Sequence, residues 1–231
     1  MKTSIFRHLT KLELGIWIAS VLLVTLSFVI FRGGSPLSLI ASLIGATALI
    51  FVAKGYVIGQ ILTVVFAVFY GVISFGFKYY GEMITYLCMT SPMAILATVE
   101  WIRNPYKETR EVKVSRVTSM KIALMLIFTL LVTIAFYFIL GALGNESLFF
   151  STLSVTTSFL ASYLTYLRSH YYALAYAAND IVLIILWVIA SLIDTSAIPM
   201  VVCFVMFLTN DLYGFINWSR MLRRQSNMAQ Q

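Results

Sequence analysis

Charged residues are scarce in this chain of 231 residues. Asp, Glu, Lys and Arg make up 11% of it, against roughly 25% in soluble domains. Hydrophobic residues reach 61% and the mean hydropathy is +0.93, which excludes a water-soluble domain. Cysteine is also rare, since only Cys88 and Cys203 occur. Both lie in apolar runs with no histidine at ligand spacing, so we expect two core residues and neither a disulfide nor a metal site.

Acidic residues are fewer than basic residues. The nine Asp and Glu against sixteen Lys and Arg give a net charge of +7. Such a charge can indicate a nucleic-acid partner, but here the basic residues gather at the ends of apolar runs. The tendency of membrane proteins to keep basic residues on one side explains this pattern. We therefore expect a lipid bilayer around the chain and no nucleic acid.

Enzyme motifs are missing as well. The sequence contains no HExxH, GxSxG or Walker A pattern, so metal-dependent proteolysis, serine hydrolysis and ATP-driven pumping lack their machinery. Asp180 and Asp211 could form an aspartyl pair inside the membrane, but the GxGD segment that usually accompanies such a pair is absent. The sequence predicts neither an enzyme nor a cofactor.

Eight apolar runs fill most of the chain. Each has about the 17 to 25 residues that a helix needs to cross ~30 Å of hydrocarbon, whereas barrel strands have about 10. The first run follows a basic N-terminus, but it lacks an A-x-A-like cleavage site and is expected to be retained. The expected spans are Leu14–Phe31, Leu37–Ala53, Tyr56–Phe77, Met83–Trp101, Ile122–Leu143, Leu148–Leu167, Tyr171–Ile193 and Ile198–Trp218.

The longest interval without an apolar run is Glu100 to Lys121, which separates two similar halves. It holds six of the sixteen Lys and Arg residues. A loop this basic is expected on the cytoplasmic side. Eight spans then place both termini inside as well and leave only Arg32 and Lys78 outside. We expect a multi-pass protein of the inner (cytoplasmic) membrane with cytoplasmic termini.

The two halves resemble each other. A shift of 117 residues lays Trp101 on Trp218 and Arg103 on Arg220. Spans two to four and six to eight form two triplets, and the fifth span between them gives both the same orientation. The expected fold is an all-α polytopic membrane protein with a core of three, one and three helices in parallel repeats, plus one extra N-terminal helix. Its parts are 1–36 (N-terminus and extra span), 37–102 (first repeat), 103–145 (basic loop and connecting span), 146–219 (second repeat) and 220–231 (cytoplasmic tail).

Polar residues inside the spans suggest a binding site. A carboxylate at mid-bilayer costs roughly 2.5 to 3.5 kcal/mol, so Asp180 and Asp211 face the bundle interior, as a site or as interhelical contacts. Aromatic rings and amides on the same helix faces suit a flat heteroaromatic ring joined to a polyol. Trp101, Trp218 and Tyr106 are instead expected in the interfacial aromatic belt. The expected substrate-binding residues are Gln60, Tyr70, Tyr176, Asn179, Asp180, Trp187 and Asn210.

Several segments resemble the PnuC-type vitamin transporters over about residues 37–220. GYVIGQILTVVFAVFYG (55–71), YYGEMI (79–84), Pro92 and EWIRN (100–104) resemble the first triplet, while AYAANDIVLIILWVIAS (175–191) and FLTNDLYGFINWSRM (207–221) resemble the second. The resemblance implies a core of three, one and three helices. It also implies import of nicotinamide riboside by facilitated diffusion, with a cytoplasmic kinase trapping the product for NAD biosynthesis.

The chain departs from the family at one motif. Members usually carry W-x-x-W followed four residues later by Asn or Asp, and here these positions fall on Ala173, Tyr176 and Asp180, while a family glutamine falls near Leu87. Nicotinamide riboside carries a positive pyridinium, for which Asp180 is placed as a counter-charge. Riboflavin, thiamin or a deoxynucleoside stay open as cargo, as do a receptor that captures its ligand without transport, proton coupling and a homo-oligomer.

Overall fold

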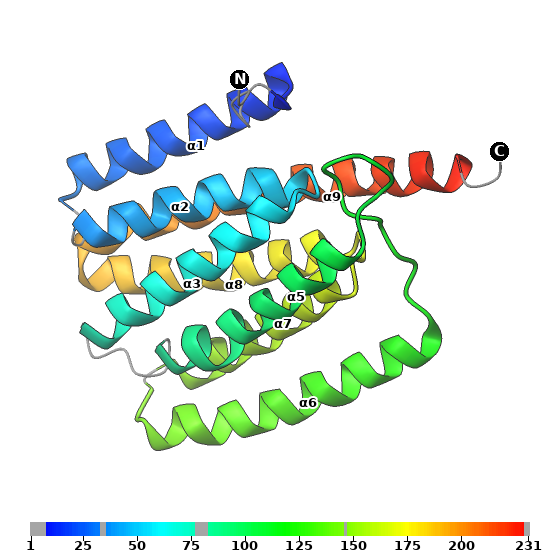
Figure 1. Cartoon of the computed structure of the whole chain (residues 1–231). Helices are drawn as coiled ribbons and strands as arrows, with labels where there is room; N and C mark the ends of the chain where they lie inside the picture. Colours follow the sequence, from blue (N-terminus) through cyan, green and yellow to red (C-terminus); the bar gives the residue numbers. More distant parts are fainter. Residues whose placement is uncertain (1–7, 33–35, 77–82, 146, 229–231) are drawn as a thin grey trace.

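The structure is a computed structural model that describes residues 8–32, 36–76, 83–145 and 147–228. Within these residues eight α-helices lie side by side in one bundle (Figure 1). Six of them are long and apolar enough to cross a membrane. The predicted class, an all-α polytopic membrane protein, is confirmed. Among the charges used to predict the topology, Lys2, Arg7 and Lys78 lie outside the described residues.

The last helix continues to Asn227, nine residues beyond the expected end at Trp218 and through most of the predicted tail. The other helices follow the expected spans closely, apart from the fourth span. That span begins with a π-helix, and Pro92 at the start of the next α-helix removes one backbone donor there. The elements are α1 (Lys11–Ile30), α2 (Pro36–Ala53), α3 (Val57–Gly76), the π-helix η2 (Thr85–Thr90), α5 (Ser91–Arg103), α6 (Ser119–Ala142), α7 (Leu148–Tyr166), α8 (Tyr172–Ile193), the short 3₁₀ helix η3 (Thr195–Ala197) and α9 (Ile198–Asn227).

Six helices form a closed ring. In order, α2 packs on α3, α3 on α5, α5 on α7, α7 on α8, α8 on α9, and α9 on α2 again. Outside the ring, α1 packs against α2 and α9, and α6 packs against α7. The two predicted triplets thus make equivalent contacts. The division into three, one and three helices stays a prediction, because α1 takes a place beside α2 like that of α6 beside α7.

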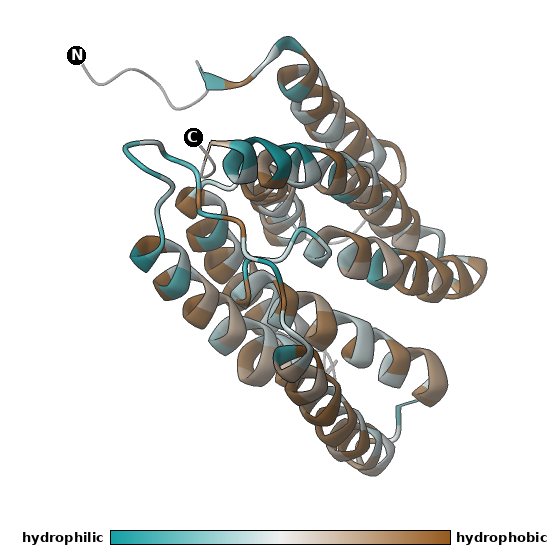
Figure 2. Cartoon of the chain, turned by 90° about the vertical axis from the view of Figure 1, so that its right-hand side faces the viewer, coloured by the Kyte–Doolittle hydropathy of each residue, from teal (hydrophilic) through white to brown (hydrophobic). Residues whose placement is uncertain are grey.

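Hydrophilic residues gather at one end of the bundle, which we call the basic end (Figure 2). Two turns of the same shape lie there, one after α2 and one after α7. Gly55 and Arg168 adopt positive φ values of 70° and 57°, the left-handed conformation that commonly ends a helix. In each turn the next amide donates to the carbonyl five residues back, at 3.0 Å. The matched turns agree with a repeat.

The interfacial role expected for Trp101, Trp218 and Tyr106 is wrong, because their exposed fractions are 0%, 0% and 8%. The Trp218 indole donates to the Val52 carbonyl at the end of α2, at 2.9 Å. The Trp101 indole donates to the Thr165 carbonyl at the end of α7, at 3.0 Å. The last carbonyls of a helix have no partner within it. Each carbonyl also accepts from an amide of the turn that follows, that of Gly55 at 2.8 Å or Arg168 at 3.0 Å. Each tryptophan therefore adds a second donor to a helix end in the opposite half of the chain.

The outer surface of the bundle is apolar. Ile193 is 88% exposed and Phe138, on α6, is 67% exposed, as expected of side chains that face lipid. Cys88 lies on this surface, so the expectation that it is a core residue is wrong. It lies on the π-helix, whose side-chain directions differ from those of an α-helix. Cys203 is buried, as expected.

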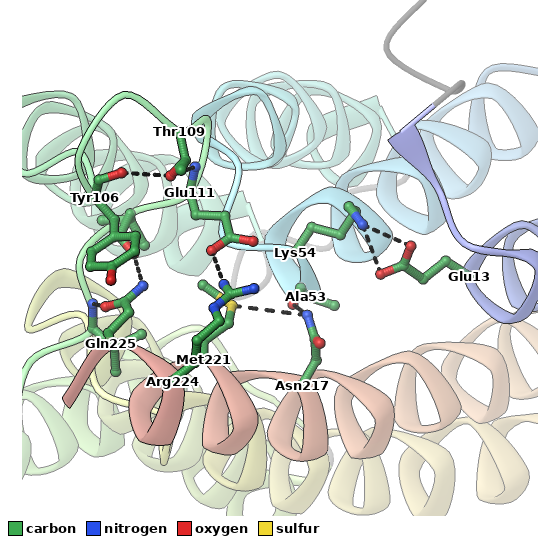
Figure 3. A network of polar contacts seen from close by, with 12 residues as sticks. Glu13, Ala53, Lys54, Tyr106, Thr109, Glu111, Asn217, Met221, Arg224 and Gln225 are labelled. Atoms are coloured by element: carbon green, nitrogen blue, oxygen red, sulfur yellow. Dashed lines mark hydrogen bonds and ion pairs between the residues drawn. The ribbon is translucent and has the colours of Figure 1, made fainter. Parts of the chain in front are cut away.

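The basic loop, residues 104–118, is fastened to α9 (Figure 3). The Gln225 side chain accepts from the Val114 amide at 2.8 Å and donates to the Val112 carbonyl at 3.1 Å. Arg224 forms an ion pair with Glu111 of the loop. The loop therefore packs against the last helix of the chain rather than hanging free between the two halves.

A buried ion pair attaches α1 to the ring. Glu13 is 2% exposed, and its carboxylate oxygens lie 3.0 and 2.8 Å from Lys54 Nζ at the end of α2 (Figure 3). The Tyr213 hydroxyl on α9 also donates to Glu13, at 2.7 Å. Thr10 and Glu13 cap the start of α1 reciprocally. One carboxylate thus connects three helices.

Replacing Lys54 by methionine is expected to lower the free energy of unfolding by about 3 kcal/mol, because the buried Glu13 carboxylate loses its cation. The measurement is unfolding of the purified protein in detergent. The double variant Glu13→Gln/Lys54→Met should recover most of the loss. The exposed Lys121→Met serves as the control and should change stability by less than about 0.5 kcal/mol. Equal losses in the single and double variants would contradict an energetic role for the pair.

Candidate functional site

A central cavity of about 80 Å³ lies inside the ring. Side chains from α2, α3, η2, α7, α8 and α9 line it. The α2 wall consists of two small residues, Gly45 and Ala48, together with Leu49 and Val52. Although the spans are otherwise largely apolar, they place several polar side chains on the cavity wall. These are Gln60, Thr63, Thr90, Ser158, Tyr176, Asn179, Asp180 and Asp211.

One part of the wall is aromatic. The Phe66 ring on α3 packs against Tyr86 of η2 and Phe207 of α9, with centroids 6.0 and 6.1 Å apart. A Cβ atom at Gly45 would lie 2.7 Å from the Phe207 ring and 3.2 Å from the Phe66 ring. Glycine is therefore what allows these rings to reach the α2 backbone. Aromatic faces of this kind suit a flat heteroaromatic ring.

The polar part of the wall belongs mainly to α8, and hydroxyl groups of α7 hold it in place. The Tyr176 hydroxyl lies 3.0 Å from Ser162 Oγ. The Asn179 side-chain oxygen accepts from the Thr157 hydroxyl at 2.9 Å and from the Ser154 hydroxyl at 3.2 Å. Because these partners fix the orientation of both side chains, the cavity presents a preformed polar surface.

Two carboxyl groups meet at this surface. Asp180 and Asp211 are 4% and 3% exposed, and their carboxyl groups lie within hydrogen-bonding range of each other. The Asp180 Oδ2 atom is buried without a hydrogen-bond partner. No lysine, arginine or histidine occurs among the described residues that line the cavity. The described residues also hold no cluster of three His, Cys, Asp or Glu side chains for a metal. The cavity is therefore acidic.

A second cavity of about 50 Å³ adjoins the first, and we call it the far-end cavity. The two linings share Tyr86, Ser158, Asn179 and Leu183. Asn145 and Ser151, which lie beyond the end of α6 and near the start of α7, line the far-end cavity. That part of the bundle is opposite the basic end, so the linings of the two cavities extend from the interior of the ring toward the far end.

The structure brings most of the predicted site residues together. Gln60, Tyr176, Asn179 and Asp180 line the central cavity. Tyr70 lines the far-end cavity, with its ring 4.5 Å from that of Tyr86. A role in substrate binding stays a prediction for all of them.

The other two predicted residues, Trp187 and Asn210, do not line the central cavity. Trp187 packs against an apolar cluster that includes Phe204. Asn210 is 1% exposed and donates to the Ser20 hydroxyl of α1 at 3.1 Å and to the Met206 carbonyl at 2.8 Å. Trp187 does share the stripe of Tyr176 and Asp180, but that stripe runs on beyond the end of the cavity. Asn210 lies about 100° around α9 from Asp211, so its side chain points away from the cavity and toward α1.

Several lining residues escaped the sequence prediction. Asp211 was recognised as a carboxylate inside a span but was not included in the site. Thr63 and Phe66 follow Gln60 at intervals of three residues, so they share its helix face, and this spacing could have revealed them. Tyr86 lies on the π-helix, where α-helical spacing does not apply.

Comparisons with known proteins agree on one group. The family model for nicotinamide mononucleotide transporters matches residues 35–220. A protein of Neisseria mucosa named nicotinamide riboside transporter PnuC is 26% identical over 230 residues, covering 97% of this chain and 87% of that protein. A Haemophilus influenzae protein of the same name is 25% identical, covering 90% of each chain. The crystal structure of the vitamin B3 transporter PnuC superimposes with a TM-score of 0.80 at 25% identity, covering 94% of each chain.

Proposed function

The chain belongs to the nicotinamide mononucleotide transporter family, and we propose that it imports nicotinamide riboside through the central cavity by facilitated diffusion. The matched residues, 35–220, include α2 to α8 and most of α9, and hence the whole lining of the cavity. Both curated relatives are named for nicotinamide riboside, and the solved structure is that of a vitamin B3 transporter. The activity of the family is transport, not catalysis.

The acidity of the cavity is the observation that carries the choice of cargo. A phosphate monoester carries about 1.5 to 2 negative charges at pH 7. The carboxyl groups of Asp180 and Asp211 would repel it, and no basic side chain of the described lining would offset this repulsion. A riboside brings no phosphate, its aromatic base suits the Phe66 cluster, and its hydroxyl groups suit the polar wall of α8. The structure therefore supports the riboside over the mononucleotide.

The proposed mechanism is alternating access, in which the two halves of the ring rock about the cavity. The far-end cavity would admit the substrate. Trp218 lies seven residues beyond Asp211 on α9, about two turns closer to the basic end. Its ring packs against Trp101 with centroids 5.2 Å apart. This contact would close the route to the basic end until the halves move apart.

The basic end supports a location and a direction. We assign the protein to the inner membrane with the basic end in the cytoplasm, because basic residues resist translocation. There a cytoplasmic kinase that phosphorylates the riboside would trap it. The added phosphate would be repelled by the acidic cavity, so the product could not return by the same route.

Purified protein in liposomes should take up labelled nicotinamide riboside to equilibrium, and a pH gradient should leave the final level unchanged. Thiamin, riboflavin, thymidine and nicotinamide mononucleotide complete the panel. We expect uptake of the mononucleotide to be at least about tenfold slower than that of the riboside, because the phosphate meets the acidic cavity.

Each of the other outcomes would contradict a different part of the proposal. Preference for another compound of the panel would contradict nicotinamide riboside as the cargo, but not the central cavity as the transport route. Accumulation above equilibrium driven by the pH gradient would replace facilitated diffusion by proton coupling. Saturable binding without any uptake would identify a receptor and overturn transport itself.

A further inference from the structure

Among the described residues, no cation lines the central cavity beside its two buried carboxyl groups, and their geometry assigns them a joint role. We propose that Asp180 and Asp211 act as one unit that shares a single proton and presents one negative charge, which selects a cationic substrate over a neutral one. The inference rests on the proposed transport of a nicotinamide nucleoside. It adds Asp211 as a specificity-determining residue and gives the class of substrate as a monovalent heteroaromatic cation.

The need for a proton follows from the contact itself. An ionised carboxylate can only accept hydrogen bonds. Asp180 and Asp211 lie within hydrogen-bonding range of each other, so a hydrogen bond between them requires a proton on one carboxyl group. Inside a membrane two adjacent carboxylates also repel each other strongly when both are ionised. One proton between the two groups satisfies the contact and leaves one net negative charge.

The remaining charge is available to a ligand. Apart from the proton shared with Asp211, no group of the described residues donates to the buried Asp180 Oδ2, and Asp180 lines the cavity. The neighbouring ionisable side chains are Tyr172, Tyr176 and Cys203, and a phenol or thiol has no cationic form. The lysine at the end of α2 is already paired with Glu13. A cation in the cavity would therefore find an unpaired charge in a medium of low dielectric constant, where such attraction is strong.

The shared-proton arrangement makes an unusual prediction for asparagine variants. An asparagine has nearly the shape of a protonated aspartic acid, and its amide can donate to the remaining carboxylate. Asp180→Asn and Asp211→Asn should each keep one negative charge. Only the double variant should lose it.

The test compares nicotinamide riboside, a cation, with its reduced dihydro form, which is neutral and nearly the same size. Initial uptake rates of both compounds are measured in liposomes for the unaltered protein, the two single variants and the double variant. We expect both single variants to keep the preference for the cation within about threefold. The double variant should lose at least about tenfold in uptake of the cation, with uptake of the neutral form changed by less than about threefold.

The neutral form also reports on folding, because a misfolded variant would carry neither compound. Asp194→Asn, in the exposed turn before η3, removes one carboxylate elsewhere and should leave the preference unchanged. Loss of the preference in Asp180→Asn alone would overturn the joint role, since Asp180 would then act by itself. Retention of the preference in the double variant would overturn any role in selection. If the unaltered protein carries neither compound, the proposed function itself fails.

Discussion

Truncation of Trp218 to alanine is expected to lower the free energy of unfolding by about 3 to 5 kcal/mol, the range for a large aromatic side chain removed from a core. The ring is 0% exposed and packs against both Trp101 and Tyr172, with centroids 5.2 and 4.8 Å away. Trp101→Ala should have an effect of the same size, because the second indole makes the equivalent bond to the other half. Unfolding of the purified protein in detergent measures both losses.

The contribution of the hydrogen bond can be separated from that of packing. Trp218→Phe keeps an aromatic ring and removes the donor to the Val52 carbonyl, at an expected cost of about 1 kcal/mol beyond the smaller ring. Trp187→Ala is the matched control, since Trp187 is only half-buried and its indole forms no bond to a helix end among the described contacts. If Trp187→Ala costs as much as Trp218→Ala, the buried tryptophan pair has no special role at the basic end.

The positions of the helices could be predicted from the sequence because a membrane span needs a long apolar run. Even the fourth span was found, although its π-helix was not. Hydropathy alone carries no information about which residue of a π-helix faces inward. Tyr86 and Cys88 show the consequence, since one lines the cavity and the other faces outward against expectation.

The tryptophans illustrate a different limit. A tryptophan near the end of a span is typical of the interfacial belt, and this rule made the wrong prediction for Trp101 and Trp218. The rule considers only lipid and water as partners for the indole. In this bundle each indole instead donates to a helix-end carbonyl from the other half of the chain. That contact depends on how α2 packs on α9 and how α5 packs on α7.

The candidate site could be predicted from the sequence only in part. Asp180 could be found because a carboxylate is costly in a membrane wherever the helices pack. Asn210 was predicted as a site residue because it is a polar side chain inside a span, yet it bonds Ser20 of α1. The sequence alone does not show which neighbouring helix such a side chain faces. The carboxyl pair could be named from the sequence as two residues on adjacent helices. That they meet in the central cavity could not be predicted, because it depends on how the ring helices pack.

Replacing Ala48 by phenylalanine is expected to reduce uptake of nicotinamide riboside to below about 1% of the unaltered rate, because the new ring would occupy the cavity needed by the substrate base. Ala48 is 2% exposed and lines the central cavity from the α2 side. Adding a large side chain to a filled core costs about 1 to 3 kcal/mol. Here the ring would enter open space, so the fold should tolerate it.

The experiment tests the transport route without assuming which polar residue binds the substrate. Uptake is measured in liposomes, and binding is measured as the rise in melting temperature that the riboside causes in detergent. Ala135→Phe, on the exposed face of α6, introduces the same ring toward lipid and should leave both uptake and binding unchanged. A well-folded Ala48→Phe variant that carries the riboside at the normal rate would place the route outside the central cavity. Loss of both uptake and binding, with an unchanged melting temperature of the free protein, would locate the substrate between α2 and α8.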